Sequence, residues 1–361
     1  MTDWKQVRAE FPSLNRWTFL NTATFGQLPQ RAVDAVSRHF AHRDETACHD
    51  FLSWFDDHDR LRAKLARLIN ASSDDIAFVP NASAALALLV AGLDWRDGDE
   101  ILTLEGEFPN QIYAPAFLGR KGVVAREVPW ERLLDSLSPR TRLVAVSTVN
   151  YVTGFRVPLD DLSRECRHRG IVLYLDGTQS LGALQFDFER IQPDMLSVNA
   201  YKWMLAPNGA AFVAVHPRLR EKLEPLNIGW RSHHDWRNVD HLHHGAPEFK
   251  TSAEKYEGGM LPSSALYALE ASVDFMLELG PDAIEQRVLS LARQCRGLFD
   301  DPLPFDDTAI VAARVADASA LAKKLKERRV LVSARHGLLR VSTHFYNDEQ
   351  DLDRLAEALR A

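Results

Sequence analysis

Cysteine is scarce in this sequence, and basic residues are outnumbered by acidic ones. The 361 residues include three cysteines, Cys48, Cys166 and Cys295, which lie far apart and form no CxxC pair. This argues against a disulfide framework and for reduced thiols. The formal charge is −7 and the pI is about 6.0. A nucleic-acid partner is therefore not expected, because such proteins normally carry an excess of basic residues on one face.

Long apolar runs are missing too. The longest, residues 83–93, is about half of what a membrane-spanning helix needs. The first residues, MTDWKQVRAEFPSL, lack the basic start and apolar stretch of a secretory signal. The composition, 46% hydrophobic and 26% charged, is that of an ordinary globular protein. We therefore expect a cytoplasmic protein with no membrane partner.

Short β-branched runs, mostly separated by helix-like stretches, fill the first two thirds of the chain. They lie at residues 76–79, 100–105, 142–149, 171–176, 195–200 and 210–216. This alternation predicts an α/β fold with buried strands in a largely parallel sheet. Ligands of such sheets bind beyond the carboxyl ends of the strands, where Ser83, Asp176 and the residues after Val149 fall.

The pattern changes after about residue 217. A long helix at 264–279 ends in Gly-Pro and is followed by a β-α-β-β-α tail. We divide the chain into an N-terminal segment (1–25), a large domain (26–255) and a small α+β domain (256–361). The N-terminal segment is expected to pack on the small domain and at the mouth of the active site.

The chemistry points to a segment around an acid, an amide and a lysine. Asp176 ends a strand, Gln179 follows three residues later, and Lys202 lies between aromatic residues after the next strand. Together they suggest a pyridoxal phosphate (PLP) site, in which Lys202 holds the cofactor as a Schiff base. Asp176 would keep the pyridine nitrogen protonated so that the ring serves as an electron sink. Gln179 would hydrogen-bond the ring hydroxyl. Taken singly, a Lys is more often a solvated surface group, and an Asp after a strand is more often a helix cap.

Eight segments, in order along the chain, resemble the class V aminotransferases. This is a family of fold type I PLP enzymes that includes cysteine desulfurase-like and isopenicillin N epimerase-like members. The segments are TFLNTATFGQLP (18–29), FVPNASAALALL (78–89), EGEFPNQIYAP (105–115), STVNYVTGFRVPL (147–159), YLDGTQSLGAL (174–184), VNAYKWMLAPNGAAF (198–212), EKYEGGMLPSSALYALEASVDFM (254–276) and GLLRVSTHFYN (337–347). The resemblance implies a large, mostly parallel, seven-stranded-type sheet domain with a smaller α+β C-terminal domain. It also implies a homodimer in which residues 258–263 reach the partner's phosphate site.

The resemblance assigns cofactor contacts residue by residue. The amides at the start of the helix near Ser83 would bind the phosphate dianion, because a helix N-terminus favours negative charge. Phe108 would stack on the ring, and Lys202 and Asp176 would be the catalytic pair. The full set of implied cofactor residues is Ser83, Ala84, Phe108, Tyr151, Asp176, Gln179, Asn199, Tyr201 and Lys202.

Substrate contacts are expected at the small domain, the mouth and a loop. Arg340 alternates with apolar neighbours at a strand start, and its planar fork suits a carboxylate. Asn21 and Ala23 belong to the mouth segment. Trp230 and Arg231 open a loop with five histidines at 233–244, which we interpret as a substrate cover rather than a metal site, since no Cys or Glu completes a ligand set.

Departures from the family pattern bear on the reaction. Cysteine desulfurases carry a catalytic Cys just upstream of the position of Arg340 and a His where this chain has Phe108; here both are missing. We therefore predict an aminotransferase acting on an α-amino acid. A β-eliminating C–S lyase or desulfurase-like enzyme, an amino-acid epimerase and a non-catalytic binding protein are the alternatives. The sequence leaves open which amino acid is used.

Overall fold

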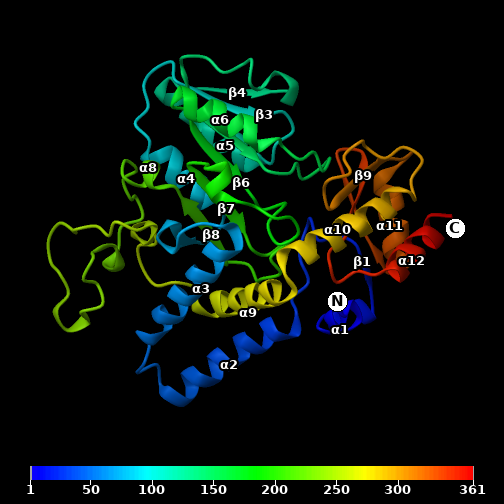
Figure 1. Ribbon diagram of the computed structural model, residues 1–361, viewed down its shortest axis with the longest axis horizontal. Helices are drawn as coiled ribbons and strands as arrows, with labels where there is room; N and C mark the ends of the chain where they lie inside the picture. The colour runs from blue at the N-terminus through cyan, green and yellow to red at the C-terminus, as the bar shows by residue number, and fades with distance from the viewer. Residues whose placement is uncertain (1, 361) are drawn as a thin grey trace.

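A seven-stranded sheet lies at the centre of the computed structural model, which describes residues 2–360 (Figure 1). Its order is β2-β8-β7-β6-β5-β3-β4, and β8 runs antiparallel to both its neighbours whereas the other pairs are parallel. The strands are β2 (Ile76–Val79), β3 (Glu100–Leu104), β4 (Val124–Val128), β5 (Thr141–Ser147), β6 (Val172–Asp176), β7 (Met195–Asn199) and β8 (Ala211–Val215). The predicted mostly parallel α/β sheet is confirmed.

The edge strand β4 is absent from the sequence prediction. It pairs in parallel with β3 at one margin of the sheet, and four of its five side chains are at least partly exposed. An edge strand buries little apolar surface, so VAREV lacks the apolar run that identifies the other strands.

The strand ends meet at one edge of the sheet. Ser147 at the end of β5 lies opposite Asp176, and Asp176 lies opposite Ser197 of β7. Both faces of these strands are buried, as a parallel sheet requires. The side chains that follow the strands therefore gather at one place.

Three long helices lie together along one side of the large sheet (Figure 1). They are α2 (Gln30–Thr46), α3 (Ser53–Ile69) and α9 (Ser263–Leu279), the last of which occupies the predicted 264–279 helix. Because α9 packs against α2 and α3, this linking helix shares its core with elements that precede residue 256. The remaining helices of this part are α4 (Ala82–Gly92), α5 (Pro109–Phe117), α6 (Leu159–Arg169), α7 (Phe188–Ile191) and α8 (Pro217–Arg220).

A small antiparallel sheet, β11-β12-β9, lies at the far end of α10 (Pro281–Arg296). The N-terminal segment joins it: β1 pairs in parallel with β10, and Asn21 bridges to Ser342. The elements of this part are α1 (Trp4–Ala9), β1 (Thr18–Phe19), β9 (Ile310–Arg314), α11 (Ala318–Glu327), β10 (Val330–Leu331), β11 (Ser333–Arg335), β12 (Leu338–Ser342) and α12 (Glu349–Arg360). The exact domain boundaries at residues 25 and 255 stay a prediction.

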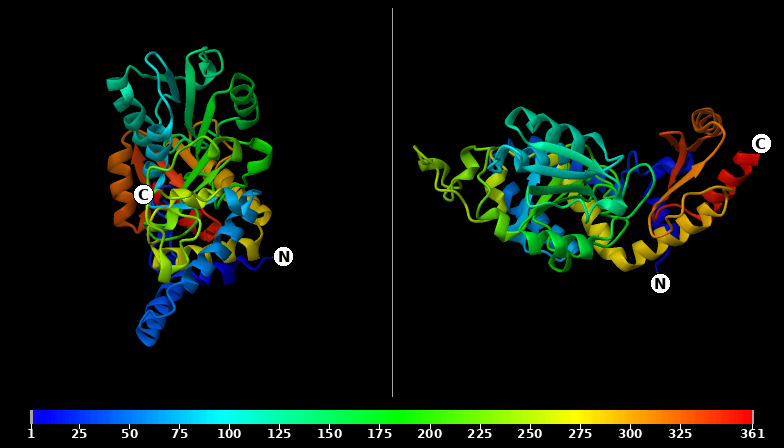
Figure 2. Two further views of the ribbon diagram at one scale, coloured as in Figure 1. Left: turned by 90° about the vertical axis from the view of Figure 1, so that its left-hand side faces the viewer. Right: turned by 90° about the horizontal axis from the view of Figure 1, so that it is seen from above.

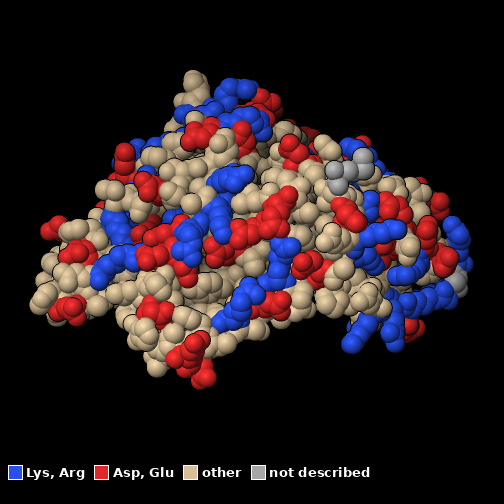
Figure 3. Space-filling model, turned by 60° about the horizontal axis from the view of Figure 1, so that its bottom comes forward, with Lys and Arg blue, Asp and Glu red and all other residues tan. Residues whose placement is uncertain are grey.

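None of the helices among residues 2–360 combines the length and the apolar character needed to cross a bilayer. Acidic and basic side chains are interspersed over the face drawn in Figure 3.

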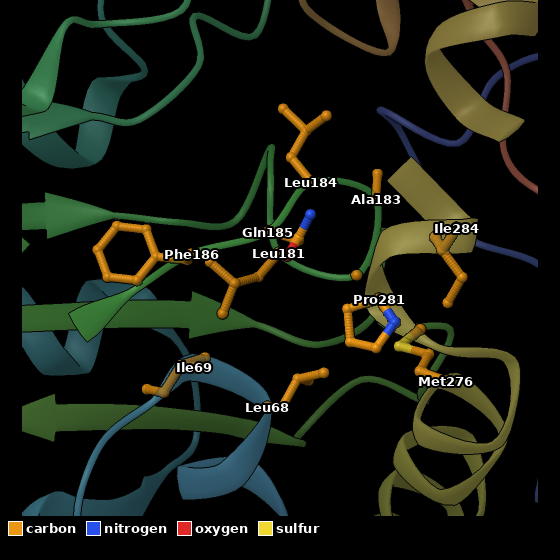
Figure 4. A pocket seen from close by; sticks show the side chains of 11 residues that line it. Leu68, Ile69, Leu181, Ala183, Leu184, Gln185, Phe186, Met276, Pro281 and Ile284 are labelled. Carbon is orange, nitrogen blue, oxygen red and sulfur yellow. The ribbon is translucent and has the colours of Figure 1, made fainter. Parts of the chain in front are cut away.

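A small apolar crevice lies where the 181–186 loop meets the α9–α10 junction (Figure 4). Leu181, Leu184, Met276 and Ile284 line it, and its volume is about 20 Å³. That is about the space of one water molecule and far below the volume of a ligand pocket. The crevice is a packing defect, and the functional site lies elsewhere.

Candidate active site

Lys202 follows β7 at the edge where the strand ends meet. Its side chain is buried, and its Nζ lies 5.7 Å from the ring centroid of Phe108 and 5.7 Å from that of Tyr201. Within residues 2–360 it forms no ion pair by distance. A buried amine without a partner carboxylate is costly, which makes Lys202 a candidate for a functional group.

The surroundings of Lys202 lower its basicity. Burial lowers the pKa of Lys202 to about 8; Asp176 opposes this shift, whereas Arg340 and Arg335 reinforce it. An amine with a pKa near neutrality is present in part as the free base at physiological pH, which is the form that attacks carbonyls and accepts protons.

Asp176 is fixed at the end of β6 by two donors. Its Oδ1 accepts from the backbone N–H of Thr178 (2.9 Å), and its Oδ2 accepts from Nε2 of Gln111 (3.0 Å). The Oε1 atom of Gln111 is buried and has no partner in the described chain. Each carboxylate oxygen of Asp176 can accept a further bond, so the residue remains able to hold a cationic ring nitrogen.

Glu107 is a site residue that the sequence analysis missed. Its carboxylate accepts from the backbone N–H and from the hydroxyl of Ser147, both at 2.6 Å. Burial raises the pKa of Glu107 to about 7 in spite of these bonds, and the charge of Asp176 acts in the same direction. Its place directly before Phe108 in a predicted cofactor segment was the available signal.

Gln179 and Tyr151 are committed in part to contacts within the chain. Gln179 accepts from Nε1 of Trp203 (2.8 Å) and donates to the carbonyl of Ala23 (3.1 Å), which leaves one N–H on its Nε2. The Tyr151 hydroxyl shares a 3.0 Å hydrogen bond with His336, and its ring meets Phe108 edge-on at 5.3 Å. Gln179 is thereby fixed to the residue after Lys202, and Tyr151 is fixed against Phe108, whose ring lies 5.7 Å from the Lys202 amine.

The start of α4 differs from the expectation. Asn81 is the N-cap, and its side chain accepts from the Ala84 N–H (2.8 Å), while Asn199 Oδ1 accepts from the Ala82 N–H (2.9 Å). The Ala84 N–H was expected to be free to bind the phosphate. That expectation is wrong, because this N–H donates to the capping side chain of Asn81. The Ser83 N–H is left as the donor of this turn that is open to an anion.

Arg340 lies on β12, fully buried, without a carboxylate partner among residues 2–360. Its Nε donates to Ser333 Oγ (3.1 Å), Nη1 to the Tyr151 carbonyl (2.5 Å) and Nη2 to Thr24 Oγ1 (2.6 Å). Burial lowers the pKa of Arg340 to about 9, and the neighbouring Arg335 adds to the effect. A buried guanidinium held only by neutral acceptors is suited to an anionic ligand.

Gly26 allows the mouth segment (residues 18–29) to lie directly against the backbone of Lys202. A Cβ at Gly26 would lie 1.9 Å from the Lys202 carbonyl oxygen, so a side chain there would prevent the approach. The Gly26 N–H donates to the Tyr201 carbonyl (2.9 Å), and the Ala23 N–H donates to Ser342 Oγ (2.9 Å). The segment therefore connects the end of β7 with the small sheet.

Trp230 and Arg231 are not brought to this cluster. The loop that follows them projects from the end of the molecule opposite the small sheet (Figures 1 and 2). Arg231 is buried and ion-paired to Glu254 (2.7 Å) and Glu257 (2.9 Å), and Glu257 also pairs with Arg62 (2.8 Å). The expected substrate contact of Arg231 is corrected, because its guanidinium is held by two carboxylates of its own chain.

The histidines of this loop do not assemble a metal set. His233 stacks on His243 with ring centroids 4.2 Å apart, and its Nδ1 accepts from the Glu248 N–H. Across residues 2–360, no three His, Cys, Asp or Glu side chains are grouped so that they could hold a metal ion.

The cysteines lie outside the cluster. Cys166 on α6 and Cys295 on α10 are buried, and burial raises the pKa of both thiols to about 12. Cys48 lies in the connection between α2 and α3. A thiol with so high a pKa is protonated at neutral pH and is a poor nucleophile.

Comparison with known protein families identifies the family of this chain. The family model described as aminotransferase class V matches residues 18–355. The chain belongs to the class V aminotransferases. The predicted fold type I architecture and membership of a PLP-dependent enzyme family are thereby confirmed.

Individual relatives of this class V chain have several activities. An isopenicillin N epimerase of Streptomyces clavuligerus is 29% identical over 100% of this chain and 98% of its own. A probable cysteine desulfurase of Methanothermobacter thermautotrophicus is 24% identical over 98% of this chain and 97% of its own. In fold, the chain is similar to a variant of C-DES with glycine covalently linked to its PLP cofactor, with a TM-score of 0.91, 23% identity and 99% of each chain covered.

Proposed function

We propose that this class V enzyme is a PLP-dependent aminotransferase of α-amino acids, with Lys202 as the residue that holds the cofactor and moves the proton. The observation that carries the proposal is the buried Lys202 amine, which has no ion-pair partner in the described chain and lies 5.7 Å from the Phe108 ring. Asp176 stands one strand away at the same edge of the sheet.

The residues present fit PLP. Phe108 is 41% exposed and offers a ring face for stacking, and Asp176 keeps accepting capacity for a protonated ring nitrogen. The Ser83 N–H at the start of α4 suits a phosphate dianion, and Asn199 lies at the same turn, where it accepts from the Ala82 N–H. Tyr201 follows two residues after Asn199. When bound, PLP supplies an electron sink for the negative charge that develops at the substrate Cα.

The chain's own groups then divide the remaining work. The two N–H groups of Arg340 that have no partner among residues 2–360 would bind the substrate carboxylate and so orient the amino acid. Asn21 and Ala23 hold the mouth segment against this arginine through Thr24 and Ser342. Lys202, with its pKa near 8, would take up the proton that leaves Cα and would be the group that moves it.

The lack of a histidine at position 108, and of a thiol beside Lys202 in the described chain, favours amino-group transfer. Phe108 has no proton to give, and none of the three thiols contacts Lys202, Asp176 or Arg340 in the described chain. One base would suffice for the proton movements at Cα that either amino-group transfer or epimerisation requires. Epimerisation is the second candidate, because a relative that is 29% identical over the whole chain is an isopenicillin N epimerase.

We further propose a homodimer in the cytoplasm. Residues 260–262 of the 258–263 loop border a hollow of about 580 Å³ with Pro80, Ala84 and Leu88, beside the start of α4, and Met260 is 54% exposed there. A second copy of the chain would cover this apolar surface and bring its own 258–263 loop to the phosphate end of the site.

Single-turnover assays test the reaction. Holoenzyme and an active amino acid are mixed without a keto-acid acceptor, and products are identified by mass and chiral chromatography. Transamination yields one equivalent of the matching keto acid per active site, and the cofactor remains in its amine form. Appearance of the mirror-image amino acid would instead identify an epimerase. Release of pyruvate with a free thiol would identify a β-eliminating lyase.

A further inference from the structure

The β11–β12 hairpin places a second arginine beside Arg340. Ser333 of β11 lies opposite Arg340 of β12, and Arg335 comes two residues after Ser333 on the same strand. Residues two apart share a face of a strand, and directly opposed residues of an antiparallel pair share it too. The side chains of Ser333, Arg335 and Arg340 therefore lie on one face of the small sheet.

Both guanidinium groups meet at one hydroxyl. Thr24 Oγ1 accepts from Arg340 Nη2 at 2.6 Å and from Arg335 Nη2 at 3.4 Å, and it donates to Asn21 Oδ1 at 2.9 Å. The two Nη2 atoms are thus no more than about 6 Å apart. Neither arginine has a carboxylate within ion-pair distance anywhere in residues 2–360.

Arg340 alone has enough free N–H donors to bind one carboxylate, so the donors of Arg335 are available for a second anion. A guanidinium has five N–H donors. Arg340 uses three of them on Ser333, Tyr151 and Thr24 and keeps one on each Nη, which together match both oxygens of a single carboxylate. Arg335 uses two, on the Ala334 carbonyl (2.8 Å) and on Thr24, and keeps three.

The charge of Arg335, which no carboxylate offsets within residues 2–360, acts on the ionisable groups around Lys202. It adds to the effect of burial that lowers the pKa of Lys202 and of Arg340, and it opposes the effect of burial that raises the pKa of Tyr151, so its field extends over the space between these groups. Two like charges this close in a partly buried place repel each other unless anions offset both.

We propose that Arg335 binds a second anionic group, carried by the substrate's side chain. The substrate class is then α-amino acids with an acidic side chain of about aspartate or glutamate size, with the α-carboxylate on Arg340 and the distal anion on Arg335. This inference rests on the proposed function for the orientation of the amino acid. A site in which both arginines share a single carboxylate is the competing arrangement.

Binding of compounds without an amino group tests the inference apart from the chemistry. The holoenzyme is titrated calorimetrically with succinate and glutarate, and with their monoamides, which keep the shape but lose one charge. We expect at least one diacid to bind about 10- to 100-fold more tightly than its monoamide, the range for a hydrogen bond between charged groups. The Arg335→Gln variant should lose this preference and bind monoamides as the wild type does.

The matched control is Arg314→Gln, on β9 of the same sheet, where the arginine is exposed and paired with Asp301. It should keep the full preference for the diacid. Equal binding of diacid and monoamide by the wild type, or no binding of either diacid, would overturn the inference. So would an Arg335→Gln variant that weakens both compounds equally, because that result indicates one shared carboxylate.

Turnover separates this inference from the proposed function. With aspartate, glutamate, asparagine and glutamine as substrates, the wild type should prefer the acid over the matching amide, and Arg335→Gln should remove that preference. A diacid preference that depends on Arg335 in an enzyme that transfers no amino group would leave the inference standing and refute the function. Transamination of neutral amino acids without any diacid preference would do the reverse.

Discussion

Gln111 donates from Nε2 to Oδ2 of Asp176 at 3.0 Å, which joins the first turn of α5 to the end of β6. The residues are 65 apart in sequence. Phe108 caps the same helix, so this hydrogen bond fixes the ring-stacking candidate relative to the acid that would face the ring nitrogen. The hydrogen bond between α5 and the end of β6 therefore holds Phe108 and Asp176 in fixed relative positions.

Replacing Asp176 with Asn should leave the fold intact and reduce the rate of turnover by about 10²-fold or more, because a neutral amide does not stabilise a protonated ring nitrogen. The measurement is kcat with an active amino acid, with circular dichroism as a check on folding. Asp161→Asn, a change at an exposed residue of α6, is the control and should keep the wild-type rate. A near-normal rate in the Asp176 variant would refute the assignment.

Glu257→Gln should lower the free energy of unfolding by about 3 kcal/mol or more, since it leaves the buried guanidinium groups of Arg62 and Arg231 without their shared carboxylate. Urea titration measures the loss. Glu248→Gln, at an exposed position of the same region, should change stability by less than about 0.5 kcal/mol. Equal effects of the two variants would show that the buried network contributes nothing beyond a surface pair.

Acid should destabilise the protein partly through His58 and His344. Burial lowers the pKa of both to about 3, from 6.5 in the unfolded chain. Between these values the unfolded state binds more protons, so the free energy of unfolding falls as the pH falls, by about 1.4 kcal/mol per pH unit for each histidine.

His58 allows a clean test of this pH dependence, because neither of its ring nitrogens has a hydrogen-bond partner in the described chain. In His58→Leu, the slope of stability against pH between about 6 and 4.5 should be smaller by about one proton. An unchanged slope would mean that His58 is already protonated in the folded state.

Removing all three thiols should leave the reaction intact. In a variant with Cys48, Cys166 and Cys295 replaced by Ala, we expect the wild-type kcat and a loss of stability from the two buried positions. A variant with Cys48→Ala alone should match the wild type in both respects. Loss of turnover in a folded triple variant would point to sulfur transfer through an enzyme thiol.

The sequence could predict those site residues that belong to a motif within one short segment. Asp176 and Lys202 each follow a recognisable strand, and parallel strands bring their carboxyl ends together. Partners far apart in sequence were not predictable in this way. Glu107 and Ser147 meet only once β5 is beside β3, and Arg231 finds Glu254 and Glu257 through a loop that local pattern does not specify.

The attachment of the cofactor to Lys202 tests the central claim most directly. Holoenzyme is reduced with borohydride, digested and analysed by mass spectrometry, in parallel with Lys202→Ala and with Lys250→Met. Lys250 is the matched control, because burial lowers its pKa to about 8 as well, but it is paired with Glu254. We predict cofactor mass on the peptide that contains Lys202 in the wild type and in Lys250→Met, and on no peptide of Lys202→Ala. Cofactor fixed to any peptide without Lys202 would contradict the account.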